Sequence, residues 1–213
     1  LYIRSDFLFA QPKARAVRPF SFYSPGSTKC TADCSQYREN THFSGAIGLD
    51  NKNNYSTVND VATMFKYALE NKTFKQIITT KNYTSSDGTL KVKSTVKDNK
   101  NVGSYLLGGK TGTTDGAGLC LASIAIDGDT ELLLVTTGAP YDKKGPHNFE
   151  DAKTIYGHFI DNYENQTILT TKDVILTLKT KYGKDDEVEF YPDREIKAYV
   201  ANDFSKDKLT YKY

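Results

Sequence analysis

The sequence is short of methionine and cysteine and has no long apolar run. No stretch approaches the roughly 20 apolar residues that span a bilayer, so we expect no membrane-spanning helix. We also expect no signal peptide in these residues. Three cysteines and three widely separated histidines offer too few ligands at suitable spacing for zinc. We therefore expect no metal site, and Cys30, Cys34 and Cys120 are expected to be buried or idle thiols.

A strong charge of either sign is absent too. The 213 residues carry a formal net charge of +2, and the lysines are scattered, a pattern typical of a solvated surface and not of a nucleic-acid partner. Hydrophobic residues make up 38% and charged residues 25%, as in a globular protein with a core. The length allows one sizeable domain, or a medium domain and a small one.

Apolar periodicity predicts two helices. The first covers 57–71, where Thr57 and Asp60 resemble a capping box, and the second covers 149–163. In the first, one stripe holds Val58, Val61, Ala62, Phe65, Ala68 and Leu69.

Between these helices the pattern predicts a sheet. Strands are expected at 105–112, 118–126 and 131–138. The last two are nearly continuous in apolar residues, which predicts strands buried on both faces with helices packed against the sheet. Asp127-Gly128-Asp129 predicts a tight turn, and Asp87-Gly88 in "DGTLKVKSTV" predicts a hairpin or an exposed strand. Beyond about residue 166, short alternating pieces predict a small all-β module, such as half a sandwich.

"LLGGKTGTTDGAG", from Leu106 to Gly118, holds a Lys-Thr-Gly triplet on a predicted strand. A glycine lets a substrate backbone lie against the strand, and Lys110 and the Thr111 hydroxyl can hold a carboxylate. The ordinary alternative is a strand that ends in a polar turn, because three-residue matches arise by chance.

The surroundings of the triplet favour the functional interpretation. "GGKTGTTDGAGLCLASIAIDG", "ELLLVTTGAP" and "FEDAK" resemble the third-motif region of the serine D-alanyl-D-alanine carboxypeptidases, which are peptidase S11-like, low-molecular-mass penicillin-binding proteins. "NTHFSGAIGLDNKNNYSTVNDVATMFKYAL" and "KTKYGKDDEVEFYPDREIKAYV" are similar to an earlier segment and to the C-terminal β module of this family.

This resemblance covers about residues 40–213 and implies a fold. We expect an α/β (α+β) penicillin-binding/β-lactamase-like domain at 1–165, with an antiparallel sheet flanked by helices, and a small C-terminal all-β, sandwich-like domain at 166–213. A helical segment of the family is missing around 33–40, where about ten residues stand between the first motif and "THF". It carries the family's Ser-x-Asn motif, which is absent between Lys29 and Lys110.

The first family motif, Ser-x-x-Lys, is also altered, because Ser27 and Lys29 in "SPGSTKCTAD" are only two apart. One added residue after Ser27 and one after Cys30 would restore the family pattern, and the single methionine of the sequence makes two lost methionines a natural explanation. We therefore hypothesise that Ser27 is the nucleophile and Lys29 its base. The alternative is a loop serine and a solvated lysine.

The resemblance implies an enzyme that removes the terminal D-alanine from peptidoglycan stem pentapeptides through an acyl-enzyme, without a cofactor. It places the terminal carboxylate on Lys110 and Thr111, the substrate backbone along Gly112, and an oxyanion hole at the N–H groups of Ser27 and Thr113. β-Lactams would act as inhibitors.

The same resemblance implies a secreted protein at the extracellular face of the bacterial cytoplasmic membrane or in the cell wall, with a C-terminal anchor outside this chain as one route to the membrane. Two other functions remain open. One is a β-lactamase, and the other is a catalytically incomplete protein that binds wall peptide. His42 is expected to be a structural hydrogen-bonding residue, and His147 and His158 loop or helix-surface residues.

Overall fold

The computed structural model describes residues 40–96, 102–143 and 145–209. The chain forms two compact units. The described residues of the sheet unit fall within 40–126 and 131–154, and those of the C-terminal unit are 127–130 and 155–209. Our predicted division at residue 166, with a helical segment missing near 33–40, stays a prediction. Among the described residues no helix combines the length and apolar character needed to cross a membrane.

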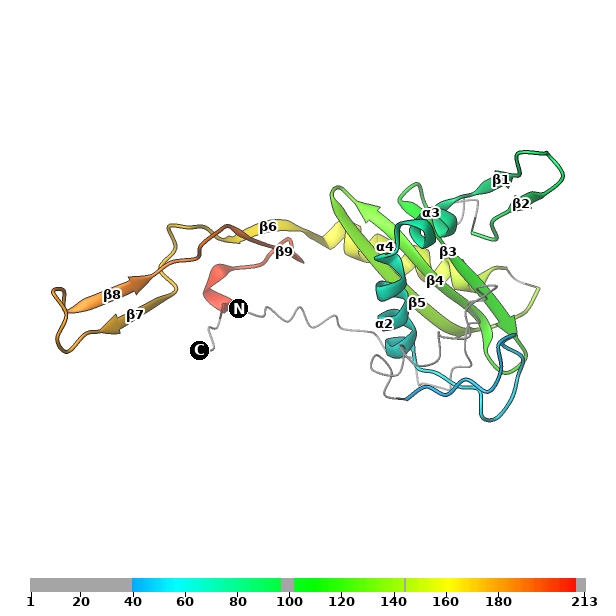
Figure 1. The fold of residues 1–213 in the computed structure, drawn as a ribbon, viewed down its shortest axis with the longest axis horizontal. Helices are drawn as coiled ribbons and strands as arrows, with labels where there is room; N and C mark the ends of the chain where they lie inside the picture. The colour runs from blue at the N-terminus through cyan, green and yellow to red at the C-terminus, as the bar shows by residue number, and fades with distance from the viewer. Residues whose placement is uncertain (1–39, 97–101, 144, 210–213) are drawn as a thin grey trace. The chain divides into compact units, whose positions relative to one another are not determined.

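The sheet unit is built on three strands in the order β3-β4-β5 (Figure 1). Strands β3 (Leu106–Thr114) and β4 (Gly118–Asp127) pair antiparallel, and β5 (Thr130–Ala139) pairs with the other side of β4. All three strands were predicted to within two residues, and the turn between β4 and β5 contains Gly128 at a φ of 55°. A positive φ is easily adopted only by glycine, which explains the turn signal.

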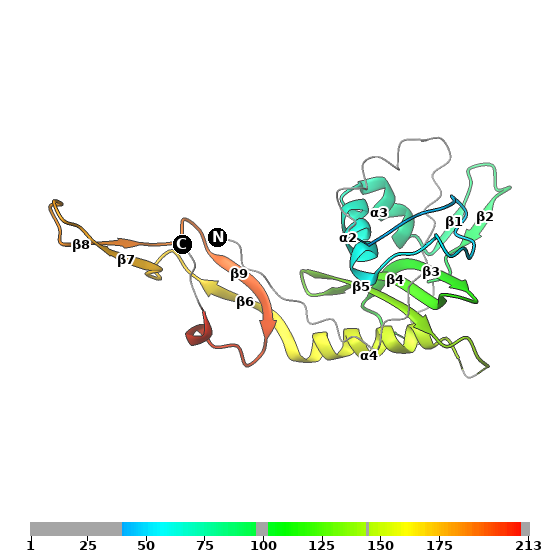
Figure 2. The same cartoon turned by 90° about the horizontal axis from the view of Figure 1, so that it is seen from below.

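Helices cover both faces of this sheet, as predicted (Figure 2). Helices α2 (Val58–Leu69) and α3 (Lys72–Thr79) lie on one face, and the start of α4 (His147–Asn162) lies on the other. Residues 120–125 of β4 are therefore all buried. The edge strand β5 is buried at only four of its ten positions, so the prediction of two fully buried faces is wrong for β5.

The core lies between the sheet and the first two helices. It consists of Val61, Phe65, Ile78, Ala122, Ile124 and Val135. The predicted cap is present, since the Thr57 side chain accepts a hydrogen bond of 3.1 Å from the Asp60 N–H. This contact satisfies one of the N–H groups that a helix start leaves without an intrahelical partner.

Helix α3 was not predicted. Its start is capped by the Asn71 side chain, which accepts from the Phe74 N–H at 3.0 Å. Its last turn lies directly on β3, because a Cβ placed on Gly108 would stand 2.3 Å from the Ile78 carbonyl oxygen. Glycine at this position therefore lets helix and strand backbones approach closely.

The predicted hairpin is present as β1 (Asn82–Thr84) and β2 (Lys91–Lys93), which pair antiparallel and are exposed. In the C-terminal unit, β6 (Tyr163–Leu169) pairs with β9 (Ile196–Ala201), and β7 (Leu176–Lys179) pairs with β8 (Glu187–Phe190). A 3-10 turn, η3 (Lys206–Lys208), follows. These strands form two two-stranded sheets, and the sandwich arrangement stays a prediction.

Candidate active site

The Lys-Thr-Gly triplet and the threonine after it lie on β3, an edge strand of the three-stranded sheet. Because side chains alternate along a strand, Thr111 and Thr113 face one way, and Lys110 and Gly112 the other. An edge strand also presents alternate N–H and C=O groups away from its neighbour. The strand can therefore accept an extended peptide, as the triplet was predicted to do.

Lys110 is exposed, and its ammonium donates a hydrogen bond to the Thr111 carbonyl oxygen. Partial loss of hydration lowers the pKa of Lys110 from its ordinary value, because removal from water disfavours the charged amine.

A cavity of about 300 Å³ lies beside β3. Its walls come from β3 and β4, from the connection between β5 and α4, and from the first turn of α4. The lining residues are Thr95, Thr111, Thr113, Leu119, Tyr141, Asp142, Gly145, Pro146, Asn148 and Phe149. Two of the predicted site residues, Thr111 and Thr113, therefore line the cavity. Its polar groups are chiefly hydroxyls, with one carboxylate and one amide.

Two contacts fix the triplet strand against its surroundings. The Thr111 hydroxyl donates to the Thr95 hydroxyl at 2.8 Å, just after β2. Beyond the end of β3, the Gly116 N–H donates to the Asp50 carboxylate at 3.0 Å. Residues outside the sheet therefore contact both the triplet and the turn that follows β3.

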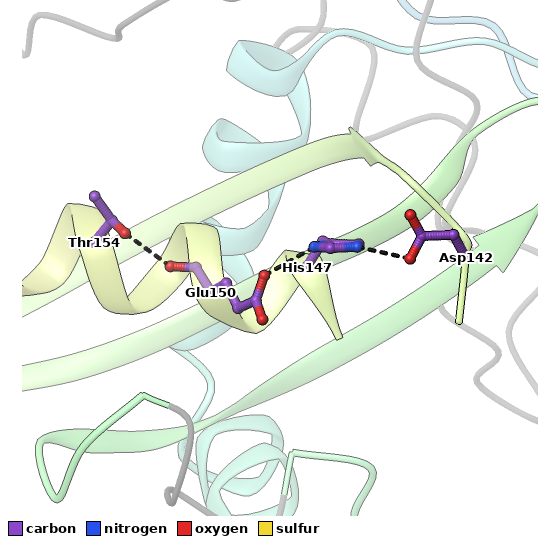
Figure 3. A network of polar contacts seen from close by, with 4 residues as sticks. All are labelled: Asp142, His147, Glu150 and Thr154. Carbon is purple, nitrogen blue, oxygen red and sulfur yellow. Dashed lines mark hydrogen bonds and ion pairs between the residues drawn. The ribbon is translucent and has the colours of Figure 1, made fainter. Parts of the chain in front are cut away.

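Sequence reasoning missed a cluster beside the cavity (Figure 3). His147 is the first residue of α4, so it is not the loop residue that was expected, and its side chain is 21% exposed. Its Nε2 lies 2.9 Å from Asp142 and its Nδ1 lies 2.8 Å from Glu150. The only sequence signal was the spacing of His147 and Glu150, three apart at a helix start.

The other histidines behave as expected. His42 is exposed, donates from Nδ1 to the Asn53 carbonyl oxygen, and stacks on Tyr55 with the ring centres 6.1 Å apart. His158 is exposed on α4. In the described parts of the chain, no group of three or more His, Cys, Asp or Glu side chains could hold a metal ion.

Ser27, Lys29, Cys30 and Cys34 lie outside the described residues. The roles assigned to Ser27 and Lys29 therefore stay predictions. Cys120 is a buried free thiol, as predicted, and burial raises its pKa.

Residues 37–141 match a family model whose description is D-alanyl-D-alanine carboxypeptidase. A D-alanyl-D-alanine carboxypeptidase from Streptomyces sp. (strain K15) is 32% identical over 111 residues, which are 47% of this chain and 38% of that protein. The family resemblance seen in the sequence is thus confirmed.

Solved structures show the same fold. Penicillin binding protein 5 from Haemophilus influenzae superposes with a TM-score of 0.60 at 22% identity, over 81% of this chain and 50% of that one. The D-alanyl-D-alanine carboxypeptidase DacD from Francisella tularensis gives 0.58 at 18% identity, over 81% of this chain and 54% of that one. The predicted penicillin-binding-like fold is confirmed, and the chain spans about half the length of these structures.

Proposed function

We propose that the protein to which this chain belongs is a serine-type D-Ala-D-Ala carboxypeptidase that trims peptidoglycan stem pentapeptides. The supporting observation is the position of Lys110, Thr111 and Gly112 on an edge strand beside a cavity of about 300 Å³, within the family-matching region. An extended peptide can bind such an edge through its own backbone hydrogen bonds. The proposed location is the extracellular face of the bacterial cytoplasmic membrane or the cell wall.

In the proposed reaction, the Ser27 hydroxyl attacks the carbonyl carbon of the penultimate D-alanine while the Lys29 amine takes the hydroxyl proton. The C–N bond then breaks, and the leaving amine of the terminal D-alanine receives that proton. Water hydrolyses the resulting serine ester and restores the enzyme. The N–H groups of Ser27 and Thr113 would stabilise the tetrahedral oxyanion.

Lys110 and Thr111 would hold the carboxylate at the end of the peptide. A charge-assisted hydrogen bond from an ammonium is about twice as strong as one between neutral groups, so Lys110 is expected to dominate this contact. A β-lactam presents a similar acid end and would acylate Ser27. The proposed chemistry requires no metal and no organic cofactor.

One observation favours a second candidate function, the binding of wall peptide without catalysis. Between Lys29 and Lys110 the sequence holds no Ser-x-Asn, the motif that shuttles a proton in the family. A protein without that motif could bind wall peptide without turning it over.

A fluorescent penicillin, together with a peptide ending in D-alanyl-D-alanine, tests the proposal on the full chain. We expect stable labelling and release of D-alanine, with both abolished by Ser27→Ala. Rapid loss of label would indicate a β-lactamase, and absence of labelling would indicate the binding protein. Either result overturns the proposal.

Two lysine variants test the carboxylate site. Lys110→Ala should slow labelling by about 10- to 100-fold, as expected when a charged contact is lost. Lys93→Ala removes an exposed lysine from β2 and should leave the labelling rate unchanged.

A further inference from the structure

His147 lies between two carboxylates, and each ring nitrogen faces one of them (Figure 3). Asp142 Oδ1 is 2.9 Å from Nε2, and Glu150 Oε2 is 2.8 Å from Nδ1. A neutral imidazole has one N–H, whereas the imidazolium has two. Only the charged ring can therefore donate to both carboxylates at once.

This bridge joins two parts of the chain that meet at the cavity. Asp142 lies in the connection between β5 and α4, and Glu150 lies in the first turn of α4. Tyr141, Asp142 and Pro146 line the same cavity as Thr111 and Thr113. Residues of the connection therefore form part of the cavity wall.

The start of α4 is anchored independently of His147. The Pro146 carbonyl oxygen accepts from the Phe149 N–H at 2.8 Å, and the buried Asn148 side chain donates to the Cys120 carbonyl oxygen of β4 at 3.3 Å. Glu150 is therefore on a fixed element. Because His147 contacts both Asp142 and Glu150, it links the connection between β5 and α4 to the start of α4.

Carboxylates surround the His147 ring. Among the described residues, Asp142 faces His147 from the connection, and Glu150 and Asp151 act on it from α4. The hydrogen bonds that the ring donates to Asp142 and then to Glu150 raise the pKa of His147, and burial raises the pKa of Asp151. If the ring loses its proton, one carboxylate faces a lone pair and the three carboxyl groups lose their shared cation.

We propose that His147 is a positioning residue: as an imidazolium it holds Asp142 against the start of α4 and so shapes the cavity beside Thr111 and Thr113 for the bound peptide. This inference rests on the proposed function for the identity of the ligand. The His147 ring contacts both carboxylates as a cation at pH values below the ordinary pKa of histidine, because a raised pKa keeps the ring charged there. This double contact is lost as the pH rises through the pKa of His147 in the folded chain.

Hydrogen exchange and NMR on the full chain test the bridge without any ligand. Exchange at the Tyr141 and Asp142 amides, corrected for the intrinsic pH effect, should increase about 5-fold or more as the His147 ring signal titrates. His147→Gln should show at every pH the exchange that the wild type reaches only when its ring is neutral. His158→Gln, on the exposed surface of the same helix, should match the wild type. Equal exchange in His147→Gln and the wild type at pH values where the ring is charged would overturn the proposal.

Ligand kinetics then separate this inference from the proposed function. With a peptide ending in D-alanyl-D-alanine, His147→Gln should raise KM about 3- to 10-fold at acidic pH and leave kcat unchanged, because it alters binding and not chemistry. An equal fall in kcat would contradict a positioning role. If the wild type neither turns over peptide nor binds penicillin, the proposed function fails, while the exchange experiment still decides the role of His147.

Discussion

The Thr111 hydroxyl donates to the Thr95 hydroxyl across 2.8 Å. The two residues are 16 apart in sequence, on β3 and just after β2. Thr111 belongs to the Lys-Thr-Gly triplet, and both threonines line the cavity. A side-chain contact from outside the sheet therefore sets the direction of a hydroxyl that the proposed substrate carboxylate would meet.

Thr95→Val should lower the free energy of unfolding by about 0.5–1 kcal/mol, because it removes one net hydrogen bond from a partly exposed pair. Urea denaturation measures this change, and Thr95→Ser should keep the bond. A double-mutant cycle with Thr111→Val should give a coupling of about 0.5 kcal/mol or more. Strict additivity would show that the two hydroxyls do not interact.

Gly108→Ala should destabilise the chain by about 1–3 kcal/mol, as overpacking does in a close-packed core. The added Cβ would stand 2.3 Å from the Ile78 carbonyl oxygen and 2.8 Å from the Thr79 Cα, both backbone atoms that cannot rotate away. Gly157→Ala is the matched control: it lies in α4 with no atom within 4 Å of the added group, so helix propensity predicts a gain of up to about 1 kcal/mol. In thermal denaturation, Gly108→Ala should lower the Tm relative to the wild type, and Gly157→Ala should leave it equal or higher.

Thr57→Ala should cost about 1 kcal/mol of stability, a usual value for loss of an N-cap side chain. The Thr57 oxygen accepts from the Asp60 N–H at 3.1 Å, and the alanine methyl cannot replace it. Thr57→Ser retains the acceptor and should fall within a few tenths of a kcal/mol of the wild type by the same ranking. Equal losses in both variants would assign the effect to the methyl group and not to the cap.

The turn of the β1–β2 hairpin should weaken only in strong acid. Hydrogen bonds from the Ser85 side chain, and then from Thr89, lower the pKa of Asp87 to about 2. A lowered carboxyl pKa favours the fold above the ordinary pKa of 3.8, and this contribution disappears as the pH falls through about 2. An NMR titration of the Asp87 carboxyl carbon measures it. In Ser85→Ala the midpoint should move up toward the ordinary value, and an unchanged midpoint would exclude Ser85 as the main cause.

The local sequence pattern predicted an element correctly where its apolar residues followed one clear period or run. The apolar stripe of α2 was predictable because a helix with one buried face needs that period. The run at 120–125 was predictable as a doubly buried strand because nearly every residue in it is apolar. Helix α3 was missed because its eight residues give a short pattern, and Ile77 is 69% exposed while its neighbour Ile78 is buried.

The sequence by itself determined the helix and strand periods, the turns at Gly88 and Gly128, and the family resemblance carried by the triplet and its flanks. These features depend on neighbours along the chain. Only the tertiary structure decided why Gly108 must be glycine, which threonines share the cavity, and that His147 lies between Asp142 and Glu150. The physical reason is that close backbone approach, cavity walls and hydrogen-bond partners depend on distances between segments far apart in sequence, and no local pattern records those distances.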